Sequence, residues 1–210
     1  MGPQPRPGVL LDRDGVLNDV LIRDGKGYPP PSAAALRIYP EAPSALAALR
    51  GAGLPIVVVT NQPDVGRGKQ TREAVDAIHA LLRQRLPIDA IEACFHAQDA
   101  GCGCRKPGTR MLHAAAARFG LDLRRSFLVG DRWSDIEAGR RVGCTTFWID
   151  RGYREPAPEH PDHVVRDVGE AARIIVRQLD ASTHASGSGD VLESSSHLEH
   201  EKGISTCDAS

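Results

Sequence analysis

Short runs of apolar residues alternate with stretches of helical periodicity over residues 9–179. The runs 9–11 and 56–59 are continuously apolar, which is typical of strands buried on both faces of a parallel sheet. This alternation predicts an α/β fold with a doubly wound, mostly parallel sheet, in which ligands bind beyond the carboxyl ends of the strands. Further strands are expected at 91–95, 126–129 and 145–149.

Two helices with one apolar face each are predicted between these runs. The first begins at Thr71, whose hydroxyl can cap a helix, and the second stops at Gly120. A last helix, expected at 168–179, closes the domain. The two apolar faces consist of Val75, Ile78, Leu82 and Leu86 in the first helix and of Met111, Leu112, Ala115 and Phe119 in the second.

The chain has 210 residues, enough for one full-sized domain and too few for two ordinary ones. We expect a folded domain over 1–180 and a disordered tail over 181–210, which is rich in Ser and Gly and lacks periodicity. A net charge of −1 gives no sign of a nucleic-acid or membrane partner. Because no spanning segment or secretory signal is visible, we expect a cytoplasmic protein, working as a monomer.

Acidic residues directly follow the first apolar run. Asp12 and Asp14 lie two positions apart in an extended segment, so that both carboxylates can face one site, and Gly15 permits a tight turn after them. Such a pair often arises by chance and merely faces water. Its position after a buried strand favours chemistry instead, with one carboxylate attacking phosphorus and the other moving protons.

Polar residues also follow the other predicted strands. Thr60, Asn61 and Gln62 can hold phosphate oxygens, although Thr and Asn are ordinary turn residues as well. Asp131 would face the same crevice as Asp12 and offers the oxygen ligand that Mg²⁺ prefers. Asp135 is expected in a supporting role, as an anion at a helix N-terminus.

Two basic residues precede the second helix. Arg105 and Lys106 enter that helix across Pro107, a position suited to binding an anion, although basic residues in a surface turn are usually just solvated. Lys106 would neutralise phosphoryl charge. The bidentate guanidinium of Arg105 would suit another part of the substrate.

These elements together resemble the four signature motifs of the haloacid dehalogenase superfamily, in the same order along 9–179. The resemblance implies that Asp12 forms an aspartyl-phosphate, that Asp14 is the acid and then the base, and that Thr60 and Lys106 bind the phosphoryl oxygens. It implies Mg²⁺ held by Asp12, the Asp14 backbone and Asp131. Substrate contacts are expected from Arg13, Asn61, Gln62, Arg67, Arg105 and Arg132.

A cluster of sulfur and imidazole ligands lies just before the basic pair. Cys94, His96, Cys102 and Cys104 can close a tetrahedral shell around Zn²⁺ with no open position, which indicates a structural site. The alternative is buried cysteines with an incidental histidine. A zinc loop over 94–104 would hold Arg105 and Lys106 in place.

The zinc loop looks like that of the branch with heptose-bisphosphate phosphatases and histidinol-phosphate phosphatase domains, which have no large cap domain. Arg67 and Tyr28 lie in segments similar to the heptose enzymes, where a basic loop suits a second phosphate, although a solvent-facing loop is the alternative. We expect hydrolysis of a small phosphorylated sugar, the 7-phosphate of D-glycero-D-manno-heptose 1,7-bisphosphate. Histidinol phosphate as substrate and a non-catalytic, zinc-stabilised binding module are the alternatives.

Overall fold

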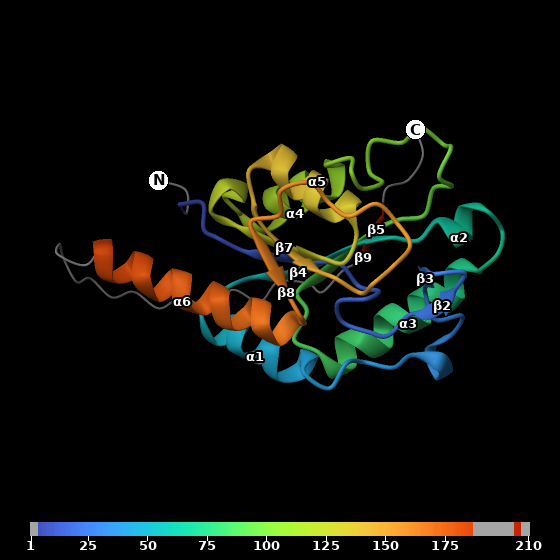
Figure 1. Cartoon of the computed structure of the whole chain (residues 1–210), viewed down its shortest axis with the longest axis horizontal. Helices are drawn as coiled ribbons and strands as arrows, with labels where there is room; N and C mark the ends of the chain where they lie inside the picture. Colours follow the sequence, from blue (N-terminus) through green and yellow to red (C-terminus); the bar gives the residue numbers. More distant parts are fainter. Residues whose placement is uncertain (1–3, 187–203, 207–210) are drawn as a thin grey trace.

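A parallel sheet forms the centre of the computed structural model, which describes residues 4–186 and 204–206. The strand order is β8-β7-β6-β1-β4-β5-β9, and every neighbouring pair is parallel (Figure 1). The predicted α/β fold with a mostly parallel sheet is therefore confirmed. The strands are β1 Val9–Leu11, β4 Ile56–Asn61, β5 Ala90–Cys94, β6 Phe127–Gly130, β7 Thr145–Ile149, β8 His163–Val165 and β9 Ile204–Thr206.

Strand β1 lies in the middle of the sheet, between β4 and β6. Val9 is paired with Ile56 on one side and with Phe127 on the other. All three residues of β1 are fully buried, as the apolar run predicts for a central parallel strand. Because β1, β4 and β6 run in the same direction, the residues that follow them meet at one edge of the sheet.

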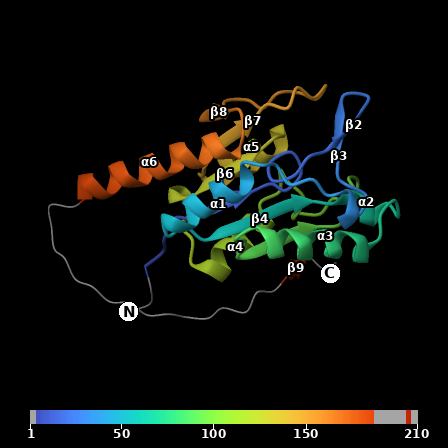
Figure 2. The ribbon, with the colours of Figure 1, turned by 90° about the horizontal axis from the view of Figure 1, so that it is seen from below.

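Helices cover both faces of the sheet (Figures 1 and 2). The helices α1 (Ala42–Gly51), α3 (Arg72–Arg85) and α6 (Val168–Ser186) share one apolar cluster with Val9 and Leu11. The helices α4 (Arg110–Phe119) and α5 (Trp133–Val142) share the other cluster with Leu10. Successive residues of β1 thus point into opposite layers, as the alternation of side chains along a strand requires.

Two predicted helix boundaries, at Thr71 and Gly120, agree closely with the structure. Thr71 caps α3, since its Oγ1 accepts a hydrogen bond from the backbone N–H of Ala74 at 3.2 Å. Helix α4 ends at Gly120, whose φ of 62° lies in the left-handed region that favours glycine. Helix α6 continues past its predicted end at Leu179 to Ser186.

A two-stranded hairpin lies between β1 and α1 and is the main insertion near the carboxyl edge of the sheet. It consists of β2 (Leu21–Arg23) and β3 (Lys26–Tyr28), paired antiparallel. The described residues also contain short helical turns, namely η1 (Ala33–Ala35), α2 (Pro63–Gly66) and η2 (Leu123–Arg125). The hairpin is small, in agreement with the prediction that the chain has no large cap domain.

The segment predicted as a tail is described only in part. Its residues 181–186 belong to α6, and 204–206 form β9, which pairs with β5, so these parts have the regular structure that the sequence did not indicate. The rest of the segment lies outside the described residues. Within 4–186 and 204–206, no helix has both the length and the apolar character needed to cross a bilayer.

Candidate active site

A buried lysine connects two carboxylates at the carboxyl edge of the sheet. Lys106 Nζ lies 2.9 Å from Asp12 Oδ1 and 2.7 Å from Asp135 Oδ1, and it also donates to the Val59 carbonyl at 2.5 Å. The backbone N–H of Asp12 donates to Val129 O at 2.9 Å, which continues the β1–β6 pairing one residue past the strand. The sheet itself thus fixes the position of Asp12.

Three acidic side chains converge beside Lys106. Asp12, Asp131 and Asp135 are all buried, and each offers a carboxylate oxygen that lies within 4.8 Å of the others. Burial raises the pKa of Asp12 to about 6, with Lys106 opposing the shift and Asp135 adding to it. Burial, with repulsion from Asp12 and Asp135, also raises the pKa of Asp131 well above its ordinary value. A single lysine therefore does not neutralise the cluster.

The cluster suits a divalent cation. Asp131 Oδ1 is buried and has no hydrogen-bond partner, so one oxygen of this carboxylate is left for another ligand. Buried carboxylate oxygens at such separations are the donor set that Mg²⁺ takes in proteins. The structure brings together the predicted ligands Asp12 and Asp131 and adds Asp135, which we expected only as a helix-terminal anion. Asp135 Oδ2 does have that role too, since it accepts from the Arg132 backbone N–H at 3.0 Å.

The turn after Asp12 leaves no room for a side chain at Gly15. This glycine has a φ of 82°, and a Cβ at its position would lie 1.9 Å from Asp131 Oδ2. The close approach of the chain to Asp131 therefore requires glycine for both conformation and space.

Asp14 lies beside this cluster but is held by a different set of partners. Its carboxylate accepts hydrogen bonds from Arg13 Nη2 at 2.9 Å, from Asn18 Nδ2 at 2.9 Å and from Gln62 Nε2 at 2.8 Å. Burial by itself would raise the pKa of Asp14, but the charge of Arg13 and these hydrogen bonds hold it below its ordinary value. Asp14 is therefore ionised at neutral pH and oriented by three donors.

The structure does not support the prediction that Arg13 binds substrate. Its side chain is fully buried, and its Nη1 contacts His79 Nε2 at 3.0 Å. Since a guanidinium can only donate, His79 accepts with Nε2. Burial and the Arg13 charge lower the pKa of His79 to about 3, so this histidine is neutral. Arg13 thus lies between His79 and Asp14 and positions the latter.

The residues at the carboxyl end of β4, and Gln62 directly after it, are divided between the core and the cleft. Thr60 and Gln62 are almost fully buried, and Gln62 Nε2 donates to Thr60 Oγ1 at 2.9 Å as well as to Asp14. Gln62 Nε2 therefore orients these two groups, while Gln62 Oε1 is buried without a hydrogen-bond partner. Asn61 lines the cleft, where its side chain pairs with the backbone N–H and C=O of Lys106 at 3.0 and 3.1 Å.

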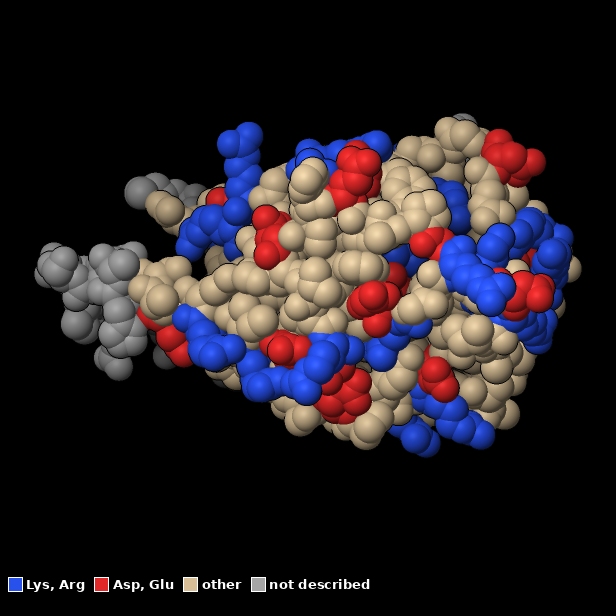
Figure 3. Space-filling view, viewed as in Figure 1, with Lys and Arg blue, Asp and Glu red and all other residues tan. Residues whose placement is uncertain are grey.

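A cleft of about 960 Å³ opens over Asp12, Asp14 and Lys106. Its walls carry basic side chains from several segments, namely Lys26, Arg67, Arg105, Arg132, Arg141 and Arg154. Figure 3 shows Lys and Arg gathered over the end of the molecule where α2 and the β2–β3 hairpin lie. The cleft is therefore suited to an anionic ligand larger than a single phosphate.

The predicted substrate-binding arginines differ in how far they are already paired. Arg105 Nη1 is buried without a hydrogen-bond partner, which leaves a donor for an anion. Arg132 donates to Glu155 at 2.9 Å and to the Gly27 carbonyl at 2.6 Å. Arg67 forms an ion pair with Asp64 and donates to Gln98 Oε1 at 2.9 Å. All three arginines line the cleft, and Arg105 has the most donor capacity left.

The predicted zinc ligands lie together at the end of β5. The Sγ atom of Cys94 is 3.6 Å from that of Cys102 and 3.4 Å from that of Cys104, and His96 Nδ1 is 3.2 Å from Cys104 Sγ. The cysteines are free thiols, and burial raises the pKa of Cys94. A tetrahedron with Zn–S bonds of ~2.3 Å has sulfurs ~3.8 Å apart, so these four groups fit Zn²⁺ closely.

Comparisons with known proteins agree with this geometry. A phosphatase from Mesorhizobium japonicum, named D-glycero-beta-D-manno-heptose-1,7-bisphosphate 7-phosphatase, is 34% identical in an alignment 186 positions long that covers 82% of this chain and 82% of its own. A Pseudomonas aeruginosa protein of the same name is 35% identical over 69% of this chain and 81% of its own. The family model described as "HAD-hyrolase-like" matches residues 103–171. The chain belongs to the haloacid dehalogenase superfamily of phosphatases.

A solved structure supports the same membership. The D,D-heptose 1,7-bisphosphate phosphatase from B. bronchiseptica, complexed with magnesium and phosphate, superposes with a TM-score of 0.71 at 28% identity. The match covers 82% of this chain and 99% of that one. Because the matching relatives are phosphatases and the family model is that of a hydrolase, the chain is a phosphoric monoester hydrolase.

The sequence did not indicate three residues that organise the site. Asn18 and His79 hold Asp14 and Arg13, and Tyr153 donates to Asp131 at 2.7 Å. His79 lies on the buried face of α3 among the predicted apolar positions, and a polar residue there was the available signal. Tyr153 lies in a loop after β7 with no motif around it, so that only the fold brings it to the site.

Proposed function

We propose that this enzyme hydrolyses the 7-phosphate of D-glycero-D-manno-heptose 1,7-bisphosphate through an aspartyl-phosphate on Asp12. The observation that carries the proposal is the contact of Lys106 with Asp12 beside the cluster formed with Asp131 and Asp135, at the base of a basic cleft. The names of the relatives, which match over most of their length, support the substrate.

The first half of the reaction forms the covalent intermediate. The Asp12 carboxylate attacks phosphorus and forms a new P–O bond, while the bond from phosphorus to the sugar oxygen breaks. Asp14 gives its proton to that oxygen, which leaves as a hydroxyl group. Lys106 already contacts Asp12 and can donate to the phosphoryl oxygens as charge develops on them.

The second half releases phosphate. Asp14, now ionised, takes a proton from a water molecule that attacks phosphorus, and the bond to Asp12 breaks. The partners of Asp14 favour this ionised form, since Arg13, Asn18 and Gln62 all donate to it. For the first half, an approaching phosphate dianion must raise the pKa of Asp14 until it takes up a proton.

The acidic cluster that includes the nucleophile Asp12 fits a magnesium ion. Asp12, Asp131 and Asp135 would hold the ion, and the bound ion would reduce the repulsion between the Asp12 carboxylate and the phosphate. The wall formed by Arg67, Arg105 and Arg132 supports a substrate with a second anionic group.

Zinc would hold the backbone of the phosphate-binding segment in place and would not contact the reacting atoms. Cys104 immediately precedes Arg105 and Lys106, so a closed Zn²⁺ site fixes the start of the phosphate-binding segment. The loop also contacts α2, because a Cβ at Gly66 would lie 2.5 Å from Phe95 O and Ala97 N. A structural zinc would thereby position both basic walls of the cleft.

A panel of phosphomonoesters tests the proposed substrate. Steady-state phosphate release is measured with heptose 1,7-bisphosphate, histidinol phosphate and several hexose phosphates at saturating Mg²⁺. We expect the highest kcat/KM for the heptose bisphosphate, with release of the 7-phosphate only. A clear preference for histidinol phosphate would contradict the heptose assignment while leaving the chemistry intact.

A further inference from the structure

The loop between β7 and β8 places a tyrosine against the proposed magnesium site. The hydroxyl of Tyr153 donates to Asp131 Oδ2 at 2.7 Å. Asp131 Oδ1 is the oxygen that has no partner. The tyrosine thus occupies one oxygen of the carboxylate and leaves the other for a cation.

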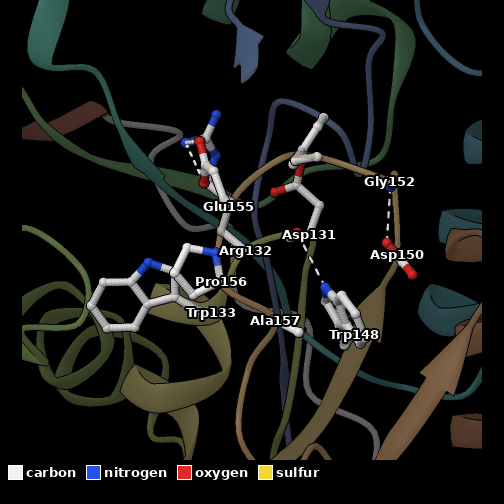
Figure 4. A pocket seen from close by; sticks show the side chains of 10 residues that line it. Asp131, Arg132, Trp133, Trp148, Asp150, Gly152, Glu155, Pro156 and Ala157 are labelled. Carbon is white, nitrogen blue, oxygen red and sulfur yellow. Dashed lines mark hydrogen bonds and ion pairs between the residues drawn. The ribbon is translucent and has the colours of Figure 1, made fainter. Parts of the chain in front are cut away.

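Asp131 is held at its backbone as well. Trp148 Nε1 donates to the Asp131 carbonyl at 3.2 Å, as the dashed line in Figure 4 shows. The two donors come from the end of β7 and from the loop that follows it. One short segment therefore fixes both the main chain and the side chain of this acid.

The Asp131 carboxylate packs against the turn at Gly15, where a Cβ would lie 1.9 Å from Asp131 Oδ2. A pocket of about 210 Å³ lies beside it, walled by Trp133, Trp148, Pro156 and Ala157 among others (Figure 4). The Tyr153 hydrogen bond adds a directional restraint to this packing, because it selects one orientation of the carboxylate.

The tyrosine also contacts the turn at Gly15 and strand β3 at Gly27. A Cβ at Gly15 or at Gly27 would lie 2.9 Å from the Tyr153 hydroxyl oxygen, so the backbone at both glycines passes directly against the tyrosine. The guanidinium of Arg132 lies 5.5 Å from the centre of the Tyr153 ring and donates to the Gly27 carbonyl. These neighbours leave the ring little freedom to move, which makes it a rigid support.

We propose that Tyr153 is a positioning residue that orients Asp131 for divalent cation binding. This inference rests on the proposed magnesium site. Removing the hydroxyl lets Asp131 turn away from Asp12 and Asp135, and the affinity for the cation falls. Partners of this kind behind a metal ligand change affinity by about 10- to 100-fold when they are removed.

Direct cation binding tests the role of the hydroxyl. Mn²⁺ is titrated into the full-length chain without substrate, free Mn²⁺ is followed by electron paramagnetic resonance, and Mg²⁺ is added as competitor. Tyr153→Phe should bind Mn²⁺ about tenfold more weakly than the wild type. Its kcat should recover at high Mg²⁺, whereas that of Asp131→Asn should not. Trp148→Phe, which keeps the Tyr153 hydroxyl, should show a smaller loss of affinity.

Tyr39→Phe is the matched control. The Tyr39 hydroxyl donates to Asp19 at 3.3 Å and not to the acidic cluster, so the Mn²⁺ affinity of this variant should equal that of the wild type. An unchanged affinity in folded Tyr153→Phe would overturn the inference. If the wild type itself binds no Mn²⁺ or Mg²⁺, the proposed magnesium site fails first, and the inference fails with it.

Discussion

Lys106 Nζ and Asp12 Oδ1 lie 2.9 Å apart, although the two residues are separated by 94 positions in the sequence. Asp12 directly follows β1, and Lys106 lies in the loop that follows the cysteine cluster. In both groups, burial and the charge of the partner shift the pKa in opposite directions. Burial would lower the pKa of Lys106, but Asp12 and Asp135 raise it above its ordinary value.

Replacing this lysine should destabilise the fold as well as the reaction. Lys106→Met removes the cation between Asp12 and Asp135, and leaving buried carboxylates unpaired costs about 3 kcal/mol of unfolding free energy. Urea denaturation monitors this change. Lys26→Met, at the rim of the same cleft, should stay within about 0.5 kcal/mol of the wild type. Equal stability of Lys106→Met and the wild type would contradict the role given to the pair.

The proton-transfer role of Asp14 predicts a substrate-dependent defect. Asp14→Asn should lower kcat on a sugar phosphate by about 10²- to 10⁴-fold. With p-nitrophenyl phosphate the leaving group needs little protonation, so the first half of the reaction should survive while hydrolysis of the intermediate stays slow. Stopped-flow absorbance should then show a burst of about one p-nitrophenol per enzyme. The absence of a burst, with equal defects on both substrates, would count against this role.

The lowered pKa of His79 predicts how the free energy of unfolding depends on pH. Its pKa of about 3 in the folded chain lies below the ~6.5 of an exposed histidine, so the unfolded state takes up a proton first as the pH falls. The contribution of His79 to the free energy of unfolding is fully present above pH ~6.5 and declines below it. Between pH 7.5 and 5.5 this contribution falls by about 1.4 kcal/mol. His79→Gln keeps an acceptor for Arg13 without titrating.

Urea denaturation at the two pH values measures the difference. The wild type should lose about 1.4 kcal/mol more unfolding free energy than His79→Gln between pH 7.5 and 5.5. The remaining titrating groups are common to both proteins and cancel in this comparison. Identical pH dependence of the two proteins would show that His79 takes up a proton in the folded chain.

The cysteine cluster predicts the zinc content of the purified protein. The wild type should contain about one zinc per chain, and Cys102→Ser should lose it. Because the loop then no longer fixes Arg105 and Lys106, phosphatase activity should fall on the order of 10²-fold. Cys144→Ala is the control, since Cys144 is buried outside the cluster and should keep both metal and activity. Full activity in zinc-free Cys102→Ser would contradict the proposal that zinc positions Arg105 and Lys106.

Much of the fold was predictable because its elements have strong local signals. Continuous apolar runs marked β1 and β4, and Thr71 and Gly120 marked helix ends. Strand β8 was missed because it has only three residues, of which Val164 is 62% exposed. Helix α6 was predicted too short, since the Ser and Gly content of the following segment outweighed the helical pattern.

The candidate site was predictable in its acids but not in its supporting contacts. Asp12, Asp14 and Asp131 each follow a buried strand, a position that the sequence shows directly. Arg13 was expected to contact the substrate. Alternation along an extended segment instead turns it into the protein, where His79 from α3 meets it, and that long-range contact has no local signal.

Converting Asp12 to Asn tests the covalent mechanism most directly. The change removes the attacking carboxylate and alters the shape of the side chain very little. Phosphate release from the preferred sugar phosphate is measured for the wild type and for Asp12→Asn, with thermal unfolding to show that the variant is folded. We expect no release above the level of the buffer, and substantial turnover by the folded variant would contradict nucleophilic attack by Asp12.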